Sequence, residues 1–277
     1  MGRGHAEERF NTGRPGCIVV TVKAMYSESH GHLRTVSDTA IEHALTQATE
    51  RGVDVVLTAG IDLASSKHAI QLAQRFKVIK ACVGIHPWNT EQYSASALTQ
   101  LKALAQAPEV VAISEIGLDY VGRMNRDWVF VSDYVDKRIQ RRAFIDQLRL
   151  ANELALPVLV HDRTPEYEVL DVLETEENAE TGVAIHGFTK DIAYAQRCTR
   201  HGIYLSIGVR DALAPENTAV REAIKRTSLD WLLTETDSPN PVDVVTVAAK
   251  IAELKGVTPQ EVGEATTRNL RALITRR

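Results

Sequence analysis

The sequence has few cysteines, no long apolar run and no large excess of charge of either sign. Its three cysteines are too scattered for a disulfide framework and have no metal-ligand spacing, which indicates a reducing compartment. No stretch approaches the ~20 apolar residues of a membrane helix, and residues 1–16, rich in Gly and Arg, lack the apolar core of a signal peptide. We therefore expect a cytoplasmic protein without a membrane segment and with a flexible tail over residues 1–16.

The charge balance excludes a molecule that attracts polyanions over its whole surface. The chain carries 32 basic and 36 acidic side chains, a formal net charge of −4, so a nucleic-acid substrate would need a local basic rim or a bound metal. With 44% apolar and 25% charged residues, the composition also excludes a disordered, collagen-like or coiled-coil chain. No repeat, low-complexity tract or linker divides the sequence, which predicts one domain over residues 17–277.

Short runs rich in β-branched residues alternate with helical patterns along this domain. An eighth run should precede Thr35, and either residues 18–22 or residues 24–28 could form it; we favour a strand that reaches Glu28. The seven clear strand candidates are residues 53–58, 78–85, 110–116, 157–161, 183–186, 203–207 and 231–236.

Apolar strands separated by helices predict a parallel sheet covered by helices. Eight such units in about 250 residues fit a closed (β/α)8 TIM barrel, an α/β fold, better than two open sheets. A doubly wound open sheet remains the alternative. Thr35, Thr164 and Thr258 are expected to cap the helices that follow them, and Glu261 completes a capping box with Thr258.

Five of the nine histidines lie at or just past the predicted carboxyl ends of strands, which form the catalytic face of a barrel. A single histidine there is more often structural than a ligand, but the clustering favours a site. His30 and His32 can enter the barrel mouth together, because alternate residues of a strand point to the same side. The other three are His86, His161 and His186, whereas His5, His43, His68 and His201 are expected to be structural or solvated.

Two carboxylates, Glu115 and Asp237, also end apolar strands. Glu115 could instead be a buried acid paired with an arginine, and Asp237 a turn residue before Ser238-Pro239. Neither alternative explains why both acids end apolar strands, where an unpaired carboxylate is costly to bury. A site of histidines and carboxylates without cysteine suits Zn, Mn, Fe or Mg, and a metal cluster accounts for both acids.

Six segments carry a resemblance to a known family. They are Ser29-His30-Gly31-His32-Leu33, Gly84-Ile85-His86-Pro87, Glu115-Ile116-Gly117-Leu118-Asp119-Tyr120, Pro157-Val158-Leu159-Val160-His161-Asp162-Arg163, His186-Gly187-Phe188 and Glu235-Thr236-Asp237-Ser238-Pro239. Together they resemble the TatD-like metal-dependent hydrolases, deoxyribonucleases of the amidohydrolase-type barrel superfamily. The resemblance spans about residues 26 to 275.

The resemblance implies two divalent metal ions. His30, His32 and Asp237 would help to hold one ion, His161 and His186 the other, and Glu115 would bridge the two. His86 would lie beside the site and contact the substrate phosphate. The sequence departs from the family pattern outside these ligands: Glu28 stands where Asp is usual, Arg34 where an acid is usual, Ser114 where Gly is usual and Gly187 where Cys is common.

The resemblance and the residue chemistry agree on hydrolysis. Two bridged cations can lower the pKa of a shared water and orient it toward a phosphodiester, and Asp237 could accept the proton of that water as the general base. We therefore expect a metal-dependent nuclease of the 3′–5′ exodeoxyribonuclease type that acts on single-stranded or frayed DNA ends, with no protein partner implied.

Two alternatives remain at this point. One is a hydrolase of small-molecule amides, esters or lactones, because a barrel fixes the site rather than the substrate. The other is a catalytically inactive metal-binding barrel. Arg163, Lys190 and Arg210 could bind phosphate from the rim, although each is more often a solvated surface charge. Trp88 could stack a terminal base or serve only in packing.

Overall fold

The computed structural model describes residues 26–33, 36–125, 129–176, 181–208 and 214–275. Eight parallel strands form one sheet in the order β1-β2-β3-β4-β7-β8-β9-β10, which confirms the (β/α)8 barrel. The strand expected to reach Glu28 is β1, and the other seven match the predicted runs. The strands are β1 (Tyr26–Gly31), β2 (Val53–Ala59), β3 (Ile79–Val83), β4 (Val110–Asp119), β7 (Val158–Arg163), β8 (Val183–His186), β9 (Ile203–Ile207) and β10 (Leu232–Thr234).

Hydrogen bonds between β1 and the region of β10 close the barrel. Ser29 Oγ donates to the carbonyl of Thr234 at 3.0 Å, and Thr234 Oγ1 donates to the carbonyl of Ser27 at 2.9 Å. Just past β10, the N–H of Asp237 donates to the carbonyl of His30 at 3.0 Å. Strands from the two ends of the described chain therefore meet at one seam.

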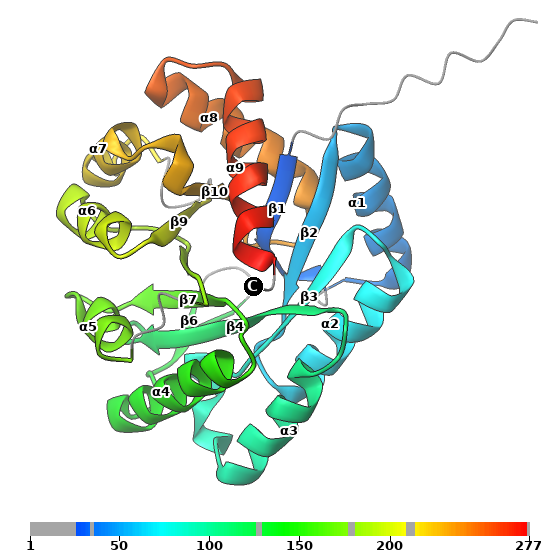
Figure 1. Cartoon of the computed structure of the whole chain (residues 1–277), viewed down its shortest axis with the longest axis vertical. Helices are drawn as coiled ribbons and strands as arrows, with labels where there is room; N and C mark the ends of the chain where they lie inside the picture. The colour runs from blue at the N-terminus through cyan, green and yellow to red at the C-terminus, as the bar shows by residue number, and fades with distance from the viewer. Residues whose placement is uncertain (1–25, 34–35, 126–128, 177–180, 209–213, 276–277) are drawn as a thin grey trace, which may run out of the picture.

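Helices surround the sheet (Figure 1), and each of them buries apolar side chains. In α1, for example, the buried residues Ile41, Ala44, Leu45 and Ala48 repeat with helical spacing. The helices are α1 (Asp38–Glu50), α2 (Leu63–Arg75), α3 (Ala95–Ala105), α4 (Lys137–Glu153), α5 (Glu168–Thr175), α6 (Ile192–Arg200), α7 (Thr218–Arg226), α8 (Val244–Lys255) and α9 (Pro259–Ile274), with 3-10 turns η2 (Pro87–Gln92), η4 (Leu229–Trp231) and η5 (Pro241–Asp243).

One of the three expected helix caps is confirmed. Thr258 caps α9 in a capping box with Glu261, as predicted. The prediction for Thr164 was wrong, because α5 begins at Glu168 and the hydroxyl of Thr164 donates instead to Asp162 at 2.7 Å. The prediction for Thr35 was also wrong: the N-cap of α1 is Ser37, whose hydroxyl accepts the N–H of Ala40.

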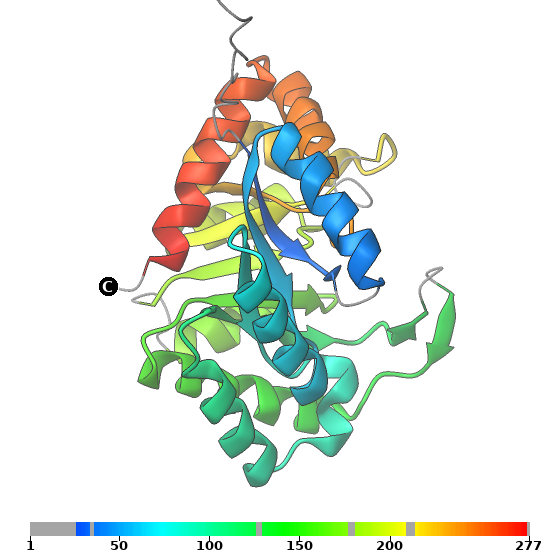
Figure 2. The ribbon, with the colours of Figure 1, turned by 90° about the vertical axis from the view of Figure 1, so that its right-hand side faces the viewer.

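A short antiparallel hairpin between β4 and α4 was not predicted. Its strands are β5 (Arg123–Met124) and β6 (Phe130–Ser132). The hairpin projects from the barrel at the right of Figure 2, at the carboxyl end of β4. The expected tail over residues 1–16, the alternative first strand at 18–22, Thr35, Arg34 and Arg210 lie outside the described residues. In the part of the chain that is described, no helix is long and apolar enough to cross a bilayer.

Candidate metal centre

The carboxyl ends of the parallel strands bring the predicted site residues together at one mouth of the barrel. His30 lies on β1, with His32 just beyond it, and Glu115 lies on β4. The others come from β7, from the end of β8 and from the segments after β3 and β10. They are His161, His186, His86 and Asp237. All seven lie in one connected cluster of imidazoles and carboxylates.

One oxygen of Glu115 faces the histidines of β1. Glu115 Oε2 lies 3.4 Å from Nε2 of His30 and 3.6 Å from Nε2 of His32. Oδ1 of Asp237 lies on the same side, 3.0 Å from Nε2 of His32 and 3.9 Å from Nε2 of His30. The expectation that the two imidazoles of the His-x-His pair point the same way is confirmed by this geometry. We call the three residues on this side, His30, His32 and Asp237, the outer group.

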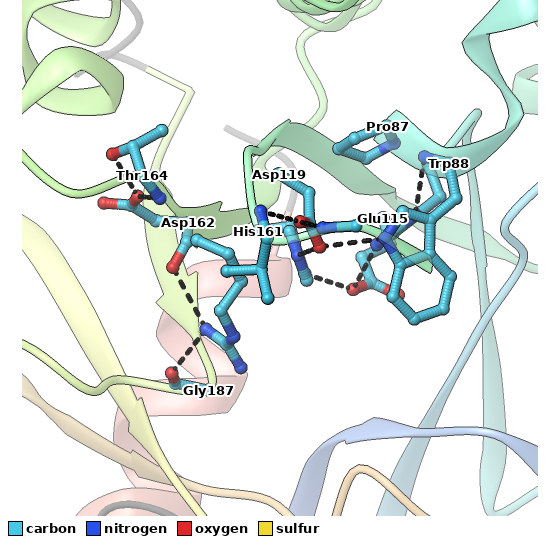
Figure 3. Close-up of polar contacts among 12 residues, drawn as sticks. Pro87, Trp88, Glu115, Asp119, His161, Asp162, Thr164 and Gly187 are labelled. Atoms are coloured by element: carbon cyan, nitrogen blue, oxygen red, sulfur yellow. Dashed lines mark hydrogen bonds and ion pairs between the residues drawn. The ribbon is translucent and has the colours of Figure 1, made fainter. Parts of the chain in front are cut away.

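The other oxygen of Glu115 faces histidines from β7 and β8. Glu115 Oε1 lies 2.8 Å from Nδ1 of His161 and 2.7 Å from Nε2 of His186. Nε2 of His86 lies 3.3 Å from the same oxygen. We call His161 and His186 the inner group. The carboxylate of Glu115 thus lies between two sets of donor atoms, one at each oxygen. Figure 3 shows the side on which Glu115 contacts His161.

Two further carboxylates, neither assigned a role from the sequence, orient the inner group. Asp119 Oδ2 lies 3.0 Å from Nε2 of His161 and also accepts the indole N–H of Trp88 at 2.9 Å (Figure 3). Glu235 Oε1 lies 3.5 Å from Nδ1 of His186. A carboxylate on the far nitrogen of an imidazole holds the proton there and leaves the near nitrogen for a metal. The sequence carried a signal for Asp119: it lies four residues past Glu115 on one strand, so the two side chains point to the same face.

His86 is oriented as a hydrogen-bond donor toward the site. Its Nδ1 accepts the backbone N–H of Trp88 at 3.1 Å. Burial lowers the pKa of His86 to about 4, so the ring is neutral at neutral pH. A neutral imidazole that accepts at Nδ1 carries its proton on Nε2, which here points at Glu115. His86 therefore presents an N–H to the mouth and not a free ligand nitrogen.

The carboxylates at the centre are ionised at neutral pH. Burial opposes ionisation of Glu115, but the imidazoles of His86, His186 and His30 outweigh it and hold the pKa of the carboxyl well below its usual range. For Asp237 burial again opposes ionisation, and the hydrogen bond and charge of His32 lower the pKa below its ordinary value. Burial lowers the pKa of His30 and keeps that ring neutral.

The donor set fits two divalent cations. Nε2 of His30 is buried, has no hydrogen-bond partner among the described residues and faces a carboxylate, so it is placed as a metal ligand would be. Donor atoms of His30, His32 and Glu115 lie within 4.8 Å of one another, and so do those of Glu115, His161 and His186. Imidazole nitrogens and carboxylate oxygens suit Zn, Mn, Fe or Mg. A third such group, of His86, Asp119 and His161, uses the nitrogen of His161 that already contacts Asp119.

Two of the departures from the family pattern have structural reasons. Glu28 is fully buried, and its Oε1 accepts the N–H groups of His30 at 2.9 Å and Thr236 at 3.0 Å, so it joins β1 to the segment after β10. Burial raises the pKa of Glu28 well above its usual value. Gly187 has φ of +55°, and a Cβ there would lie 2.5 Å from Nη2 of Arg163. The glycine therefore makes room for that guanidinium.

The expected rim residues Arg163 and Lys190 form intramolecular hydrogen bonds and ion pairs. Nη1 of Arg163 donates to the carbonyls of Asp162 at 3.1 Å and Gly187 at 2.9 Å. Lys190 donates to the carbonyl of Thr164 and lies 3.4 Å from Oδ1 of Asp162, so its ammonium group is held against β7. Trp88 is half-buried, and its indole N–H donates to Asp119, which holds the ring beside the site.

A parallel barrel with a buried cluster of histidines around a shared carboxylate defines a metal-dependent hydrolase of the amidohydrolase type. The family model described as "TatD related DNase" matches residues 28–275. The chain belongs to this family, as its sequence motifs predicted.

Known relatives cover most of the chain. It is 31% identical over 266 residues to the uncharacterized metal-dependent hydrolase YabD of Bacillus subtilis, covering 90% of this chain and 98% of that protein. It is 30% identical over 250 residues to the 3'-5' ssDNA/RNA exonuclease TatD of Citrobacter koseri, covering 84% and 92%. The crystal structure of YjjV, a TatD homologue from Escherichia coli, superposes with a TM-score of 0.80 at 25% identity, covering 91% of this chain and 98% of that one.

Proposed function

We propose that this protein is a two-metal nuclease that removes nucleotides from the 3′ end of single-stranded DNA. The observation that carries the proposal is Glu115, whose two oxygens face two separate groups of histidines at 2.7 to 3.6 Å. A carboxylate placed in this way is suited to bridge two cations. A relative named as a 3'-5' ssDNA/RNA exonuclease supports nucleic acid as the substrate.

The proposed ligands divide as the two groups do. His30, His32 and Asp237 would hold one ion and His161 and His186 the other, with Glu115 shared. When bound, two divalent cations supply charge stabilisation for a phosphodiester and a nucleophilic water at neutral pH. Asp237, whose side chain is 25% exposed, is the carboxylate of the cluster most open to solvent and would accept the proton of that water.

His86 would bind the substrate phosphate. Its Nε2–H points into the site and the ring is neutral, so it would donate a hydrogen bond without delivering a proton. A phosphate oxygen is a strong acceptor for such a donor. We assign His86 the orientation of the scissile phosphate and Asp237 the transfer of the proton.

One assay tests the proposal. Protein stripped of metal is supplied with single cations and offered 3′-labelled single-stranded DNA, 5′-labelled DNA, and a panel of esters, amides and lactones. We expect release of 3′ nucleotides that needs an added cation. His43→Ala, which alters an exposed histidine on α1, is the matched control and should behave as the parent does.

Two results would overturn the proposal. Cleavage of the small esters, amides or lactones but not of DNA would assign the site to a different bond. Stoichiometric metal binding with no hydrolysis of any substrate would make the protein an inactive metal-binding barrel.

A further inference from the structure

The hairpin of β5 and β6 carries an exposed apolar surface. Phe130 on β6 is 53% exposed, and its neighbours Val129 and Val131 are 58% and 57% exposed. Every large apolar side chain that is exposed in the described parts of the chain lies in this one stretch between β4 and the first turn of α4. They are Val121, Val129, Phe130, Val131, Tyr134 and Ile139. Exposed apolar surface concentrated in this way marks an interaction site.

The ring of Phe130 is held in place without being covered. Gly122 has φ of +113°, and a Cβ there would lie 2.8 Å from Cε2 of Phe130. The ring therefore rests on the bare backbone of Gly122 while more than half of its surface stays open. An aromatic ring that is already ordered loses little conformational entropy when a ligand stacks on it.

The hairpin is joined directly to the metal centre. Oδ1 of Asp119 accepts the N–H groups of Val121 at 2.9 Å and Gly122 at 3.0 Å, while its Oδ2 contacts His161. One carboxylate thus fixes both the base of the hairpin and an imidazole of the inner group. A chain-like substrate that leaves the site on this side would meet the hairpin next.

The charge around the hairpin suits a polyanion. The described residues between 120 and 142 carry five basic and two acidic side chains, in a chain whose formal net charge is −4. At the base of the hairpin, Nζ of Lys137 lies 4.0 Å from the ring centroid of Tyr120, and the rings of Tyr120 and Tyr134 are 5.7 Å apart. Aromatic rings interleaved with cations are typical of surfaces that bind single-stranded nucleic acid.

We propose that the β5–β6 hairpin is a stacking platform for the bases of a single strand whose 3′ end lies at the metal centre. The inference rests on the proposed nuclease function and names a substrate subsite for it. Phe130 stacks on a base, and Arg123 and Lys137 lie close to the backbone phosphates. The platform gives affinity without sequence preference, because every base has a face to stack.

The position of the hairpin sets the expected substrate length. Gly122 lies three residues past Asp119, a path of at most about 11 Å along an extended chain, and Phe130 packs on it. With successive stacked nucleotides about 3.4 Å apart, this path spans at most about three spacings, so the ring meets about the third or fourth nucleotide from the end. The affinity of the parent enzyme should therefore rise as the substrate grows from two to about four nucleotides and then level off.

The experiment compares kcat/KM for a 12-nucleotide strand with that for a dinucleotide, using metal-loaded enzyme. Loss of one stacked base weakens binding by roughly 10-fold or more, so Phe130→Ala should lower the ratio of the two values by about that factor, through KM for the longer strand. Phe130→Leu keeps an apolar side chain without a ring, and it should lower the ratio as much as Phe130→Ala does. Phe130→Tyr keeps the ring and should retain the parent ratio.

Three outcomes would overturn the platform. The ratio could be the same in all four proteins while the parent degrades the 12-mer. Phe130→Leu could match the parent, which would mean that the longer strand needs apolar surface there and not a stacking ring. A dimer of the parent that Phe130→Ala dissociates, seen by analytical ultracentrifugation, would assign the hairpin to a second copy of the chain. Circular dichroism checks that each variant is folded.

Failure of the nuclease proposal is separable from failure of the platform. If the parent cleaves no oligonucleotide, the proposed function falls, and the platform is judged by fluorescence anisotropy of a labelled 12-mer with metal-loaded protein. The platform is still supported if the parent binds the 12-mer, Phe130→Ala and Phe130→Leu weaken this binding, and Phe130→Tyr retains it. No binding to the parent, or equal binding to all variants, rejects it.

Discussion

The two groups on either side of Glu115 are built differently. In the inner group, His161 contacts Asp119 and His186 faces Glu235, and both imidazoles are at most 7% exposed. In the outer group, His32 is 15% and Asp237 25% exposed, and Asp237 has φ of +51°. Buried imidazoles oriented by a second carboxylate are already aligned for a metal. Under the proposed ligand set, the inner side would be organised to retain its ion. On the outer side His30 is buried, and the edge formed by His32 and Asp237 would admit substrate and water.

Glu115→Gln should have the largest effect, because it removes the one group that both sides share. The amide keeps the shape of the side chain but lacks the charge that holds two cations together. Each cation contributes several kcal/mol of charge stabilisation, so we expect turnover to fall by on the order of 10⁴ or more, with lower metal content. Metal analysis and single-turnover cleavage check both effects. Full occupancy with full turnover would refute a bridging role.

Asp237→Asn tests the outer side alone. The amide retains an oxygen ligand but cannot accept a proton at neutral pH, so the metals should largely stay while turnover falls by on the order of 10² to 10⁴. His161→Ala is the matched change on the inner side and should deplete the metal, with activity partly recovered by added cation. Asp237→Asn with parental rates and full metal would mean that another group is the base.

Asp119→Asn sharpens the comparison without touching a proposed ligand. An amide in place of Oδ2 would donate to Nε2 of His161 and force the proton onto Nδ1, the nitrogen that faces Glu115. We expect metal affinity of the inner side to fall by about 10- to 100-fold. Titration with a competing chelator measures this. Asp230→Asn, at an exposed aspartate of η4, is the control, and equal affinities for the two variants would remove Asp119 from the site.

Of the effects considered, we expect the change of metal affinity with pH to be the smallest. Burial lowers the pKa of His186, but the carboxylates of Glu115 and Glu235 outweigh this and raise it to about 10. The metal-free site therefore holds a proton on His186 at neutral pH, which the ion must displace. Affinity should rise about tenfold per pH unit below about 10. Calorimetry in buffers of different ionisation enthalpy should detect about one proton released at pH 7; no release would contradict a protonated His186.

The barrel and the cluster were predictable because both follow from strand ends. Apolar runs of four to eight residues predicted the buried parallel strands. A polar residue such as Glu115 or His161 at the end of such a run lies at the barrel mouth, where catalytic groups gather. Helix caps were less predictable, because the hydroxyl of a residue such as Thr164 can be taken by a tertiary partner. Only the capping box at Thr258, with two reciprocal bonds, was unambiguous.

The orienting carboxylates and the hairpin could not be predicted in the same way. Asp119 and Glu235 stand within motifs, but their roles depend on which nitrogen of a distant imidazole they face, and that is a tertiary fact. The hairpin strands are two and three residues long and exposed, so they lack the apolar alternation by which a half-buried strand is recognised.

The seam between β1 and β10 has a consequence for synthesis of the protein. His30 and His32 are made early and Asp237 late, yet the backbone of Asp237 is bonded to His30 and its side chain contacts His32. Under the proposed ligand set, the outer ion has its full coordination only after the ribosome has passed residue 237 and the barrel has closed. Full coordination of the outer ion would then require a chain that extends past the last strand, and a product truncated before residue 237 would not bind this ion with all its ligands.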